Sequence, residues 1–325
     1  MKHKRIRAAL ASLIALLALE GQAQALKSIG MTTIVETPAI LDTKNGMLMG
    51  LKEKGWEEGK NFTLDYQNAN GAMPTQQQIS QKFVSRDMDF VLTITTPSTQ
   101  SMASASQDIP IVFATVTDPV GAKIIPQFEK PGGNVTGVSD ASPLAEQLAL
   151  FQEIVGDLKT IGFLYNPSLA NSAALLRWIK EEAGKSNITI VEAPAPTTNE
   201  VIAATRSLLG KVDAIYIPTD TTILSAVESI VKVGRETQTP VFAGEPGSVK
   251  RGAVATVGLD YIEIGRLSGL MAGDILNGAT VGKIDAILAK DVQAEKTITI
   301  NLSAAEATGL KISDALKKRA KIITE

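Results

Sequence analysis

Acidic residues stand at five points where the sequence predicts that a β-strand ends: Asp118, Asp140, Asp220, Glu245 and Asp260. Few Lys or Arg residues share these positions, and a buried carboxylate needs a compensating partner. A positively charged group on a small ligand, such as an ammonium, would supply that partner. Taken singly, each of the four Asp residues is also explained as a helix cap or turn residue. Asp140 and Asp260 are alternatively hinge residues.

Hydroxyl side chains form a second set at predicted strand ends. The Thr96-Pro97-Ser98 step is a strand-to-helix turn, where free backbone N–H groups and the helix dipole favour an anion. A plain helix cap is the alternative interpretation. Hydroxyl and N–H groups on one side of a site and carboxylates on the other suit a zwitterion. The other polar or aromatic residues at predicted strand ends are Thr33, Thr37, Thr117, Tyr165, Asn166 and Thr219.

Several kinds of chemistry are excluded by composition. The chain has no Cys, and its one His is His3, inside a predicted leader. Nucleophilic sites that need His or Cys, Cys/His zinc sites and disulfides are therefore excluded. The Gly-rich turns at 55–60 and 132–133 lack the spacing of a phosphate-binding loop. We expect no catalysis, no cofactor and no metal, although paired carboxylates could in principle do acid–base work as a hydrolase.

Residues 1–25 have the three parts of a secretory signal peptide. Basic residues open the chain, an apolar run follows over Ala8–Leu19, and Ala23-Gln24-Ala25 is a small-x-small cleavage pattern. The apolar run is too short to span a bilayer, which takes about 20 residues. We therefore expect cleavage after Ala25. No Cys follows that could carry a lipid anchor, so we expect a protein free in the periplasm.

Charge gives one further indication. Without residues 1–25 the chain loses four of its 32 Lys and Arg and one of its 34 Asp and Glu, which leaves a net charge of −5. A mildly acidic chain without a basic block argues against nucleic acid as a partner.

Short apolar runs alternate with amphipathic stretches along the rest of the chain, which predicts an α/β fold with parallel sheets covered by helices. The predicted strands are 28–34, 62–67, 90–94, 111–116 and 134–138, then 160–165, 188–192, 214–218, 240–243 and 254–259. The predicted helices are 39–54, 75–86, 98–106, 122–128 and 144–155, then 170–183, 198–209, 223–236 and 262–276. Residues 297–325 add a strand and two short helices.

The second half repeats the order of the first. Ser28-Ile29-Gly30 corresponds to Thr160-Ile161-Gly162, and both halves have an X-Pro-(Ile/Val) strand entry and a closing Asp before a long helix. We predict two doubly wound parallel-sheet lobes with a hinge and an interlobe cleft. The first lobe comprises 26–140 plus about 261–285, and the second comprises 141–260 plus about 286–325. In such sheets ligands bind beyond the carboxyl ends of the strands, which places the polar residues above in the cleft.

The chain from about residue 26 onward resembles the tryptophan/tyrosine-type family of ABC transporter substrate-binding proteins. The resemblance lies in 95–100, 109–121 (IPIVFATVTDPVG), 131–140 (PGGNVTGVSD), 212–220 (VDAIYIPTD), 240–247 (PVFAGEPG) and 258–265. It implies a type I periplasmic-binding fold that captures an amino acid, often aromatic, between the lobes. Thr37 departs from the family pattern, which commonly has a His before the Pro, so a ring that could line the pocket is absent.

The expected function is therefore that of a monomeric periplasmic solute receptor for an ABC permease, which binds an amino acid or an amino-acid-like molecule. Thr96 and Ser98 would take the ligand carboxylate, Asp220 or Glu245 its ammonium, and Asp118 would orient it. Two alternatives stay open at this point. One is a sugar receptor on the same fold, and the other is a ligand-sensing subunit that docks on a membrane receptor.

Overall fold

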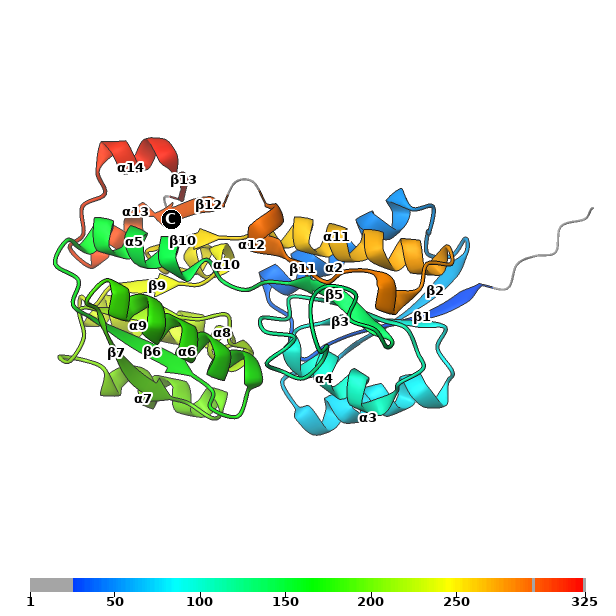
Figure 1. The fold of residues 1–325 in the computed structure, drawn as a ribbon. Helices are drawn as coiled ribbons and strands as arrows, with labels where there is room; N and C mark the ends of the chain where they lie inside the picture. The colour runs from blue at the N-terminus through cyan, green and yellow to red at the C-terminus, as the bar shows by residue number, and fades with distance from the viewer. Residues whose placement is uncertain (1–25, 294–295, 324–325) are drawn as a thin grey trace, which may run out of the picture.

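The computed structural model describes residues 26–293 and 296–323, so the predicted signal peptide lies outside the described residues. The chain forms two α/β lobes side by side (Figure 1). The first lobe is built on a parallel six-stranded sheet in the order β11-β5-β4-β3-β1-β2. Its strands are β1 (Lys27–Thr33), β2 (Phe62–Asn68), β3 (Phe90–Ile94), β4 (Ile111–Ala114), β5 (Val135–Ser139) and β11 (Ile287–Leu288).

The second lobe repeats this strand order in its parallel sheet, β7-β6-β8-β9. A backbone bond from Val254 N to Val241 O joins β9 to β10 at 2.6 Å, and β10 belongs to a further sheet, β10-β12-β13. These strands are β6 (Thr160–Tyr165), β7 (Thr189–Pro194), β8 (Ala214–Ile217), β9 (Val241–Ala243), β10 (Ala255–Gly258), β12 (Thr297–Asn301) and β13 (Lys321–Ile323). The predicted internal repeat is thus a repeat of topology.

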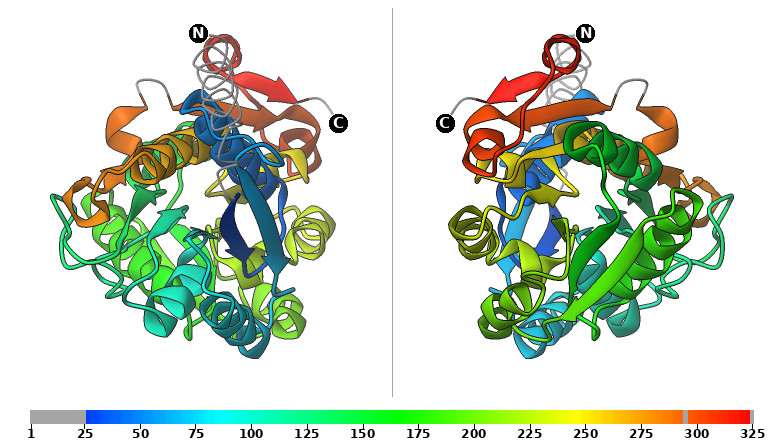
Figure 2. Two further views of the ribbon diagram at one scale, coloured as in Figure 1. Left: turned by 90° about the vertical axis from the view of Figure 1, so that its right-hand side faces the viewer. Right: turned by 90° about the vertical axis from the view of Figure 1, so that its left-hand side faces the viewer.

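Helices cover both faces of each sheet, and each lobe has one apolar cluster per face. In the first lobe, α2 and α11 cover one face and α3 and α4 the other (Figures 1 and 2). In the second lobe, α5 and α6 pack on one face and α7 and α9 on the other. The first-lobe helices are α2 (Pro38–Glu53), α3 (Met73–Ser85), α4 (Thr96–Ala105), α11 (Tyr261–Leu276), η2 (Val281–Lys283) and α12 (Ala289–Val292).

The second-lobe helices are α5 (Leu144–Val155), α6 (Ala170–Lys185), η1 (Thr198–Glu200), α7 (Val201–Ser207), α8 (Thr221–Leu224), α9 (Val227–Glu236), α10 (Pro246–Lys250), α13 (Leu302–Ala307) and α14 (Asp314–Arg319). The C-terminal strands and helices lie on the same side of the molecule as α2 and α11 (Figure 2). No helix in the described ranges is long and apolar enough to cross a membrane.

One predicted helix is absent, and the reason is local. Residues 122–128 form turns, because Lys123 adopts a left-handed conformation with φ 58° and Pro126 follows three residues later. A helix needs right-handed backbone and an N–H at each interior position. Lys123 lacks the right-handed backbone, and Pro126 lacks the N–H. The segment packs Ile124 and Ile125 into the first-lobe core instead.

Helices α2 and α11 approach each other through glycine. A Cβ added at Gly46 would lie 2.0 Å from the carbonyl oxygen of Ile262, and one added at Gly265 would lie 2.0 Å from that of Thr43. Gly50 and Gly269 continue the contact one turn further along each helix. Because α11 directly follows the second lobe in sequence, this backbone-to-backbone contact attaches the returning chain to the first lobe.

The chain passes between the lobes three times: from β5 to α5, from β10 to α11, and from α12 to β12. The return segment reaches β11, whose Ile287 pairs with Val138 of the first-lobe sheet. We infer that the first-lobe part of the return segment extends a few residues beyond the expected boundary near 285. These three crossing segments connect the two lobes.

Candidate functional site

A cavity lies between the carboxyl ends of the two sheets, and both lobes line it. About 30 Å³ of it is open to the centre of a water-sized sphere, which is room for about two waters. A small organic ligand is larger than this space, so the lobes must move apart for it to enter. The lining residues are Thr37, Ala39, Ile40, Thr95, Thr96, Thr115, Thr117, Asp140 and Tyr261 from the first lobe, and Asn171, Thr219, Thr221, Leu224 and Glu245 from the second.

The structure brings six of the predicted site residues to this cavity: Thr37, Thr96, Thr117, Asp140, Thr219 and Glu245. They meet because parallel strands end at the same edge of a sheet and the two edges face each other. Thr37 begins α2 as its N-cap, where its hydroxyl accepts a 3.4 Å bond from Ile40 N. The Thr96 hydroxyl accepts from Thr117 N, also at 3.4 Å, which ties two strand ends together.

Asp140 has a buried carboxylate with few partners. Its side chain accepts a 3.2 Å hydrogen bond from the Thr117 hydroxyl and a long 3.5 Å bond from the Tyr261 hydroxyl. Burial disfavours the charged form and raises the pKa of Asp140 to about 6, against the opposing effect of the Thr117 hydrogen bond. The pKa of Tyr261 is raised well above its usual value, first by burial and then by the charge of Asp140. No Lys or Arg is among the described residues that line the cavity.

Glu245 also lines the cavity, but it is a helix cap as well. Its carboxylate begins α10 by accepting from Gly247 N at 2.5 Å and from Ser248 N at 2.6 Å, and the Ser248 hydroxyl also donates to it. Burial raises its pKa. Gln147 holds Gly244, the residue before Glu245, in place, because its amide donates to the carbonyl oxygens of Gly244 and Val257.

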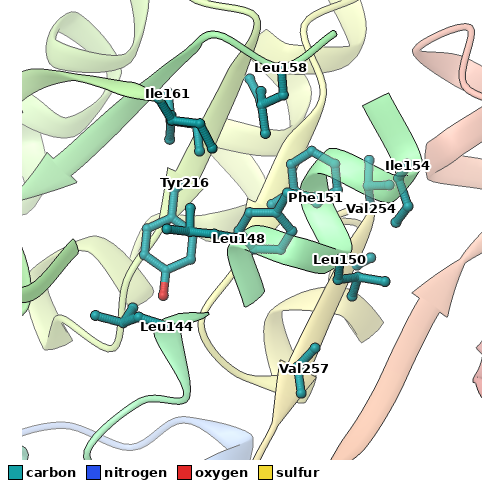
Figure 3. Packing of buried hydrophobic residues seen from close by; sticks show 14 of the residues in the cluster. Leu144, Leu148, Leu150, Phe151, Ile154, Leu158, Ile161, Tyr216, Val254 and Val257 are labelled. Carbon is teal, nitrogen blue, oxygen red and sulfur yellow. The ribbon is translucent and has the colours of Figure 1, made fainter. Parts of the chain in front are cut away.

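The Tyr216 hydroxyl in turn donates to Gln147 Oε1 at 2.7 Å. Figure 3 shows the ring of Tyr216 packed among Leu148, Phe151 and Ile161, with its hydroxyl at the edge of the apolar cluster. The second-lobe core thus positions the strand end that carries Glu245.

Asp220 lies outside the cavity, and its carboxylate is fully engaged. It is the N-cap of α8 and accepts from the backbone N–H groups of Thr222 and Ile223. It also accepts from Asn166 N at 2.6 Å and from the Ser172 hydroxyl at 2.5 Å. Four donors leave no direction for a ligand ammonium, so the structure does not support the ammonium role predicted for Asp220.

Three other predicted residues turn their side chains into the protein or to its surface. The Thr33 hydroxyl donates to the carbonyl oxygen of Val35 at 2.9 Å, and the Ser98 hydroxyl donates to Gln76 Oε1 at 2.9 Å. The Tyr165 hydroxyl donates to Glu192 at 2.8 Å at the outer side of β7. None of these three lines the cavity in the described structure.

The remaining three lie around the cleft rather than in the cavity. Asp118 accepts from Gly121 N at 2.8 Å and forms an ion pair across the cleft with Arg177 of α6 at 3.1 Å. Asn166 lines a groove at the cleft mouth. Asp260 is the exposed N-cap of α11 and lines an outer groove.

Two lining residues that the sequence reasoning missed have unusual backbone. Thr95 has φ 82° and Thr115 has φ 54°, a region that β-branched residues rarely adopt. They lie beside each other, because Thr95 N donates to the Thr115 hydroxyl at 3.1 Å. Thr115 was expected inside a strand, but β4 ends at Ala114, and the next residue, Thr115, has the left-handed conformation. Strained backbone of this kind concentrates at binding sites.

Asn171 was also missed, because it lies in the first turn of α6 and no strand end indicates it. Its Nδ2 donates to the carbonyl oxygen of Thr219 at 3.2 Å. Its Oδ1, like the Thr219 hydroxyl, is buried and has no hydrogen-bond partner within the part of the chain that the structure describes. Both atoms belong to residues that line the cavity.

Two doubly wound lobes, a three-segment hinge and a polar cavity between them define a two-lobed substrate-binding protein of the type I periplasmic class. The family model described as "ABC transporter substrate binding protein" matches residues 28–323, and the chain belongs to that family. It is 41% identical over 258 residues to a tyrosine-binding protein of Clostridioides difficile (strain R20291), which covers 79% of this chain and 75% of that protein.

Two solved structures indicate the arrangement of the lobes. The ABC domain from Streptococcus pneumonia in complex with L-Trp is 30% identical, with a TM-score of 0.87 over 92% of this chain and 100% of that one. A ligand-free, open substrate-binding protein from Clostridium difficile is 36% identical, with a TM-score of 0.70 over 92% and 99%. The chain superposes better on the L-Trp complex than on the open protein, although it is less identical to the complex.

Proposed function

We propose that this protein captures an amino acid between its lobes and delivers it to an ABC permease in the inner membrane. The observation that carries the proposal is the buried carboxylate of Asp140, which lines the cavity with no Lys or Arg among the described lining residues. A ligand ammonium would compensate that charge. The Thr96 hydroxyl and the backbone at the start of α4 lie on the same lobe and suit the ligand carboxylate.

The ligand class follows from the site together with the relatives. Tyrosine and tryptophan are named for a relative and for a structural neighbour that this chain matches over most of its length. Ile40, Leu224 and Tyr261 supply apolar surface in the cavity, where an aromatic side chain would be placed. We therefore propose an aromatic amino acid as the ligand.

The role is capture without chemistry. After residue 25 the sequence has no His and no Cys, and a ligand with higher affinity for the closed state is sufficient to drive closure. The basic start and apolar run of residues 1–25 support export to the periplasm. Both lobes of one chain line the cavity, and we propose that the protein binds its ligand as a monomer.

A thermal-shift screen of the chain from residue 26 against amino acids and sugars tests this proposal. A ligand at 100 times its dissociation constant stabilises the folded protein by about 2.7 kcal/mol, so L-Tyr or L-Trp should raise the melting temperature. A shift with a sugar and with no amino acid would refute the proposed ligand class. Growth of a deletion strain on the amino acid as a required nutrient separates transport from sensing.

A further inference from the structure

We infer that Asn171 determines specificity, because its side-chain oxygen requires a hydrogen-bond donor from the side chain of the ligand. The inference rests on the proposed function, since it names which amino acids the same cavity selects. It begins from a buried polar atom that has no partner among the described residues: Asn171 Oδ1. The residue is only 3% exposed, and an unpaired buried acceptor carries a desolvation penalty.

The orientation of the Asn171 amide is fixed by its other atom. Nδ2 donates to the carbonyl oxygen of Thr219 at 3.2 Å, and a carbonyl oxygen can only accept. A flipped amide would place two acceptors together. Oδ1 is therefore the amide atom that is left without a hydrogen-bond partner among the described residues, and it can accept a hydrogen bond but cannot donate one. Because Asn171 lines the cavity, a bound ligand can supply the missing donor.

The position of Asn171 separates it from the proposed ammonium site. Asp140 is followed by Ala141 and Ser142, which line a groove on the hinge side of the cleft. Asn171 is preceded by Ser168 and Leu169, which line the groove at the mouth. Asp140 and Asn171 thus line the cavity from different lobes, and a different groove lies beside each of them. A ligand with its ammonium at Asp140 directs its side chain toward Asn171.

The surroundings at the mouth end favour an uncharged side chain. Thr221 lines both the cavity and the mouth groove. None of the described residues that line this groove is charged. The ligand side chain should therefore be uncharged and should carry a hydrogen-bond donor for Asn171 Oδ1. An indole N–H or a phenol O–H meets both conditions, because each is an uncharged donor on an apolar ring. The phenyl ring of phenylalanine has the same shape as that of tyrosine but no donor.

Closure makes this requirement selective. In an open cleft water can satisfy Asn171 Oδ1, and closure around phenylalanine removes that water without replacing it. Sites built to bond a ligand hydroxyl reject the analogue that lacks it for this reason. We expect the wild-type protein to bind L-Tyr or L-Trp between about tenfold and a hundredfold more tightly than L-Phe, the range that one unpaired buried group gives.

The experiment is isothermal titration of wild-type and Asn171→Leu protein with L-Tyr, L-Trp and L-Phe. Leucine has the same branching and number of side-chain heavy atoms as Asn but no acceptor, so the variant should lose most of the preference while its L-Phe affinity stays equal or rises. The control is Gln107→Leu, which removes a side-chain amide from an exposed residue outside the cavity. The control should keep the preference.

Each outcome decides the inference. Equal wild-type affinities for the three ligands would overturn it without any variant. An Asn171→Leu protein that weakens L-Tyr and L-Phe by the same factor shows a merely structural role and overturns it as well. If none of the three ligands binds the wild-type protein, the proposed function fails, and this inference falls with it.

Discussion

Replacing Asp140 by Asn should stabilise the ligand-free protein and weaken ligand binding at the same time. Burial raises the pKa of Asp140 from 3.8 to about 6, and each pKa unit corresponds to about 1.4 kcal/mol. An ionised Asp140 therefore destabilises the closed, ligand-free fold by about 3 kcal/mol near neutral pH. Asn has the same shape and no charge, so the free energy of unfolding should rise by up to that amount at pH 7.

The sign of the pH dependence follows from the raised pKa. Between about pH 4 and pH 6 the native protein binds this proton and the unfolded chain does not, so the contribution of Asp140 to stability falls as the pH rises. Below about pH 4 the carboxyl is protonated in both states, and the advantage of the Asn variant should disappear. Urea denaturation of both proteins at pH 4 and pH 7 measures this difference.

Ligand titration completes the test. Loss of the charge that faces the ligand ammonium should weaken amino-acid binding by at least about tenfold, since a hydrogen bond to a charged group contributes about 1.5–3 kcal/mol. Asp260→Asn is the matched control, because Asp260 is exposed, caps α11 and lies outside the cavity. The reasoning is refuted if Asp140→Asn is no more stable than wild type at pH 7, or if it binds the ligand with unchanged affinity.

Three further predictions concern residues outside the ligand contacts. Gly265→Ala places a methyl 2.0 Å from the Thr43 carbonyl oxygen, and this overpacking should cost about 1–3 kcal/mol in denaturation experiments despite the better helix propensity of Ala. A melting temperature equal to that of wild type would contradict the close helix contact. Arg177→Ala removes the exposed ion pair to Asp118 across the cleft, so affinity should fall by no more than about fivefold, with the difference vanishing in high salt. Asp220→Ala leaves four donors without their acceptor and should lower the free energy of unfolding by about 3 kcal/mol; weaker ligand binding in a variant of wild-type stability would instead support a direct contact.

Much of the fold was predictable from the sequence because its signals are local. The β3 and β6 boundaries were predicted to the residue, since each strand is a short apolar run that ends at a Thr or an Asn-Pro turn. The helix expected over 122–128 was not found, because the left-handed conformation of Lys123 depends on packing that a single sequence does not show. The contact between α2 and α11 joins glycines that are far apart in the sequence, and their spacing within each helix does not indicate which helix is the partner.

The site was predicted less completely than the fold. Strand ends brought Asp140 and Glu245 to the cavity as expected, because sheet topology alone determines where those ends lie. Topology does not determine the direction of a side chain, and Ser98 bonds Gln76 inside the first lobe instead of facing the cleft. Asn171 was missed because a helical residue enters the cavity only through the closure of one lobe on the other.

The five strand-end carboxylates nevertheless differ in the element that comes after each of them in the chain. Asp220, Glu245 and Asp260 each stand directly before a helix and accept from its first N–H groups. Asp118 begins a turn and accepts from Gly121 N. Asp140 differs because the chain then crosses to the second lobe, so α5 begins only at Leu144, with Pro143 before it. Among the described residues, no N–H group of α5 bonds the Asp140 carboxylate, and the predicted start of that helix at Leu144 already contained this information. A strand-end Asp that is separated from its helix by a hinge segment is left with its charge uncompensated, and this is the condition that a ligand ammonium fulfils.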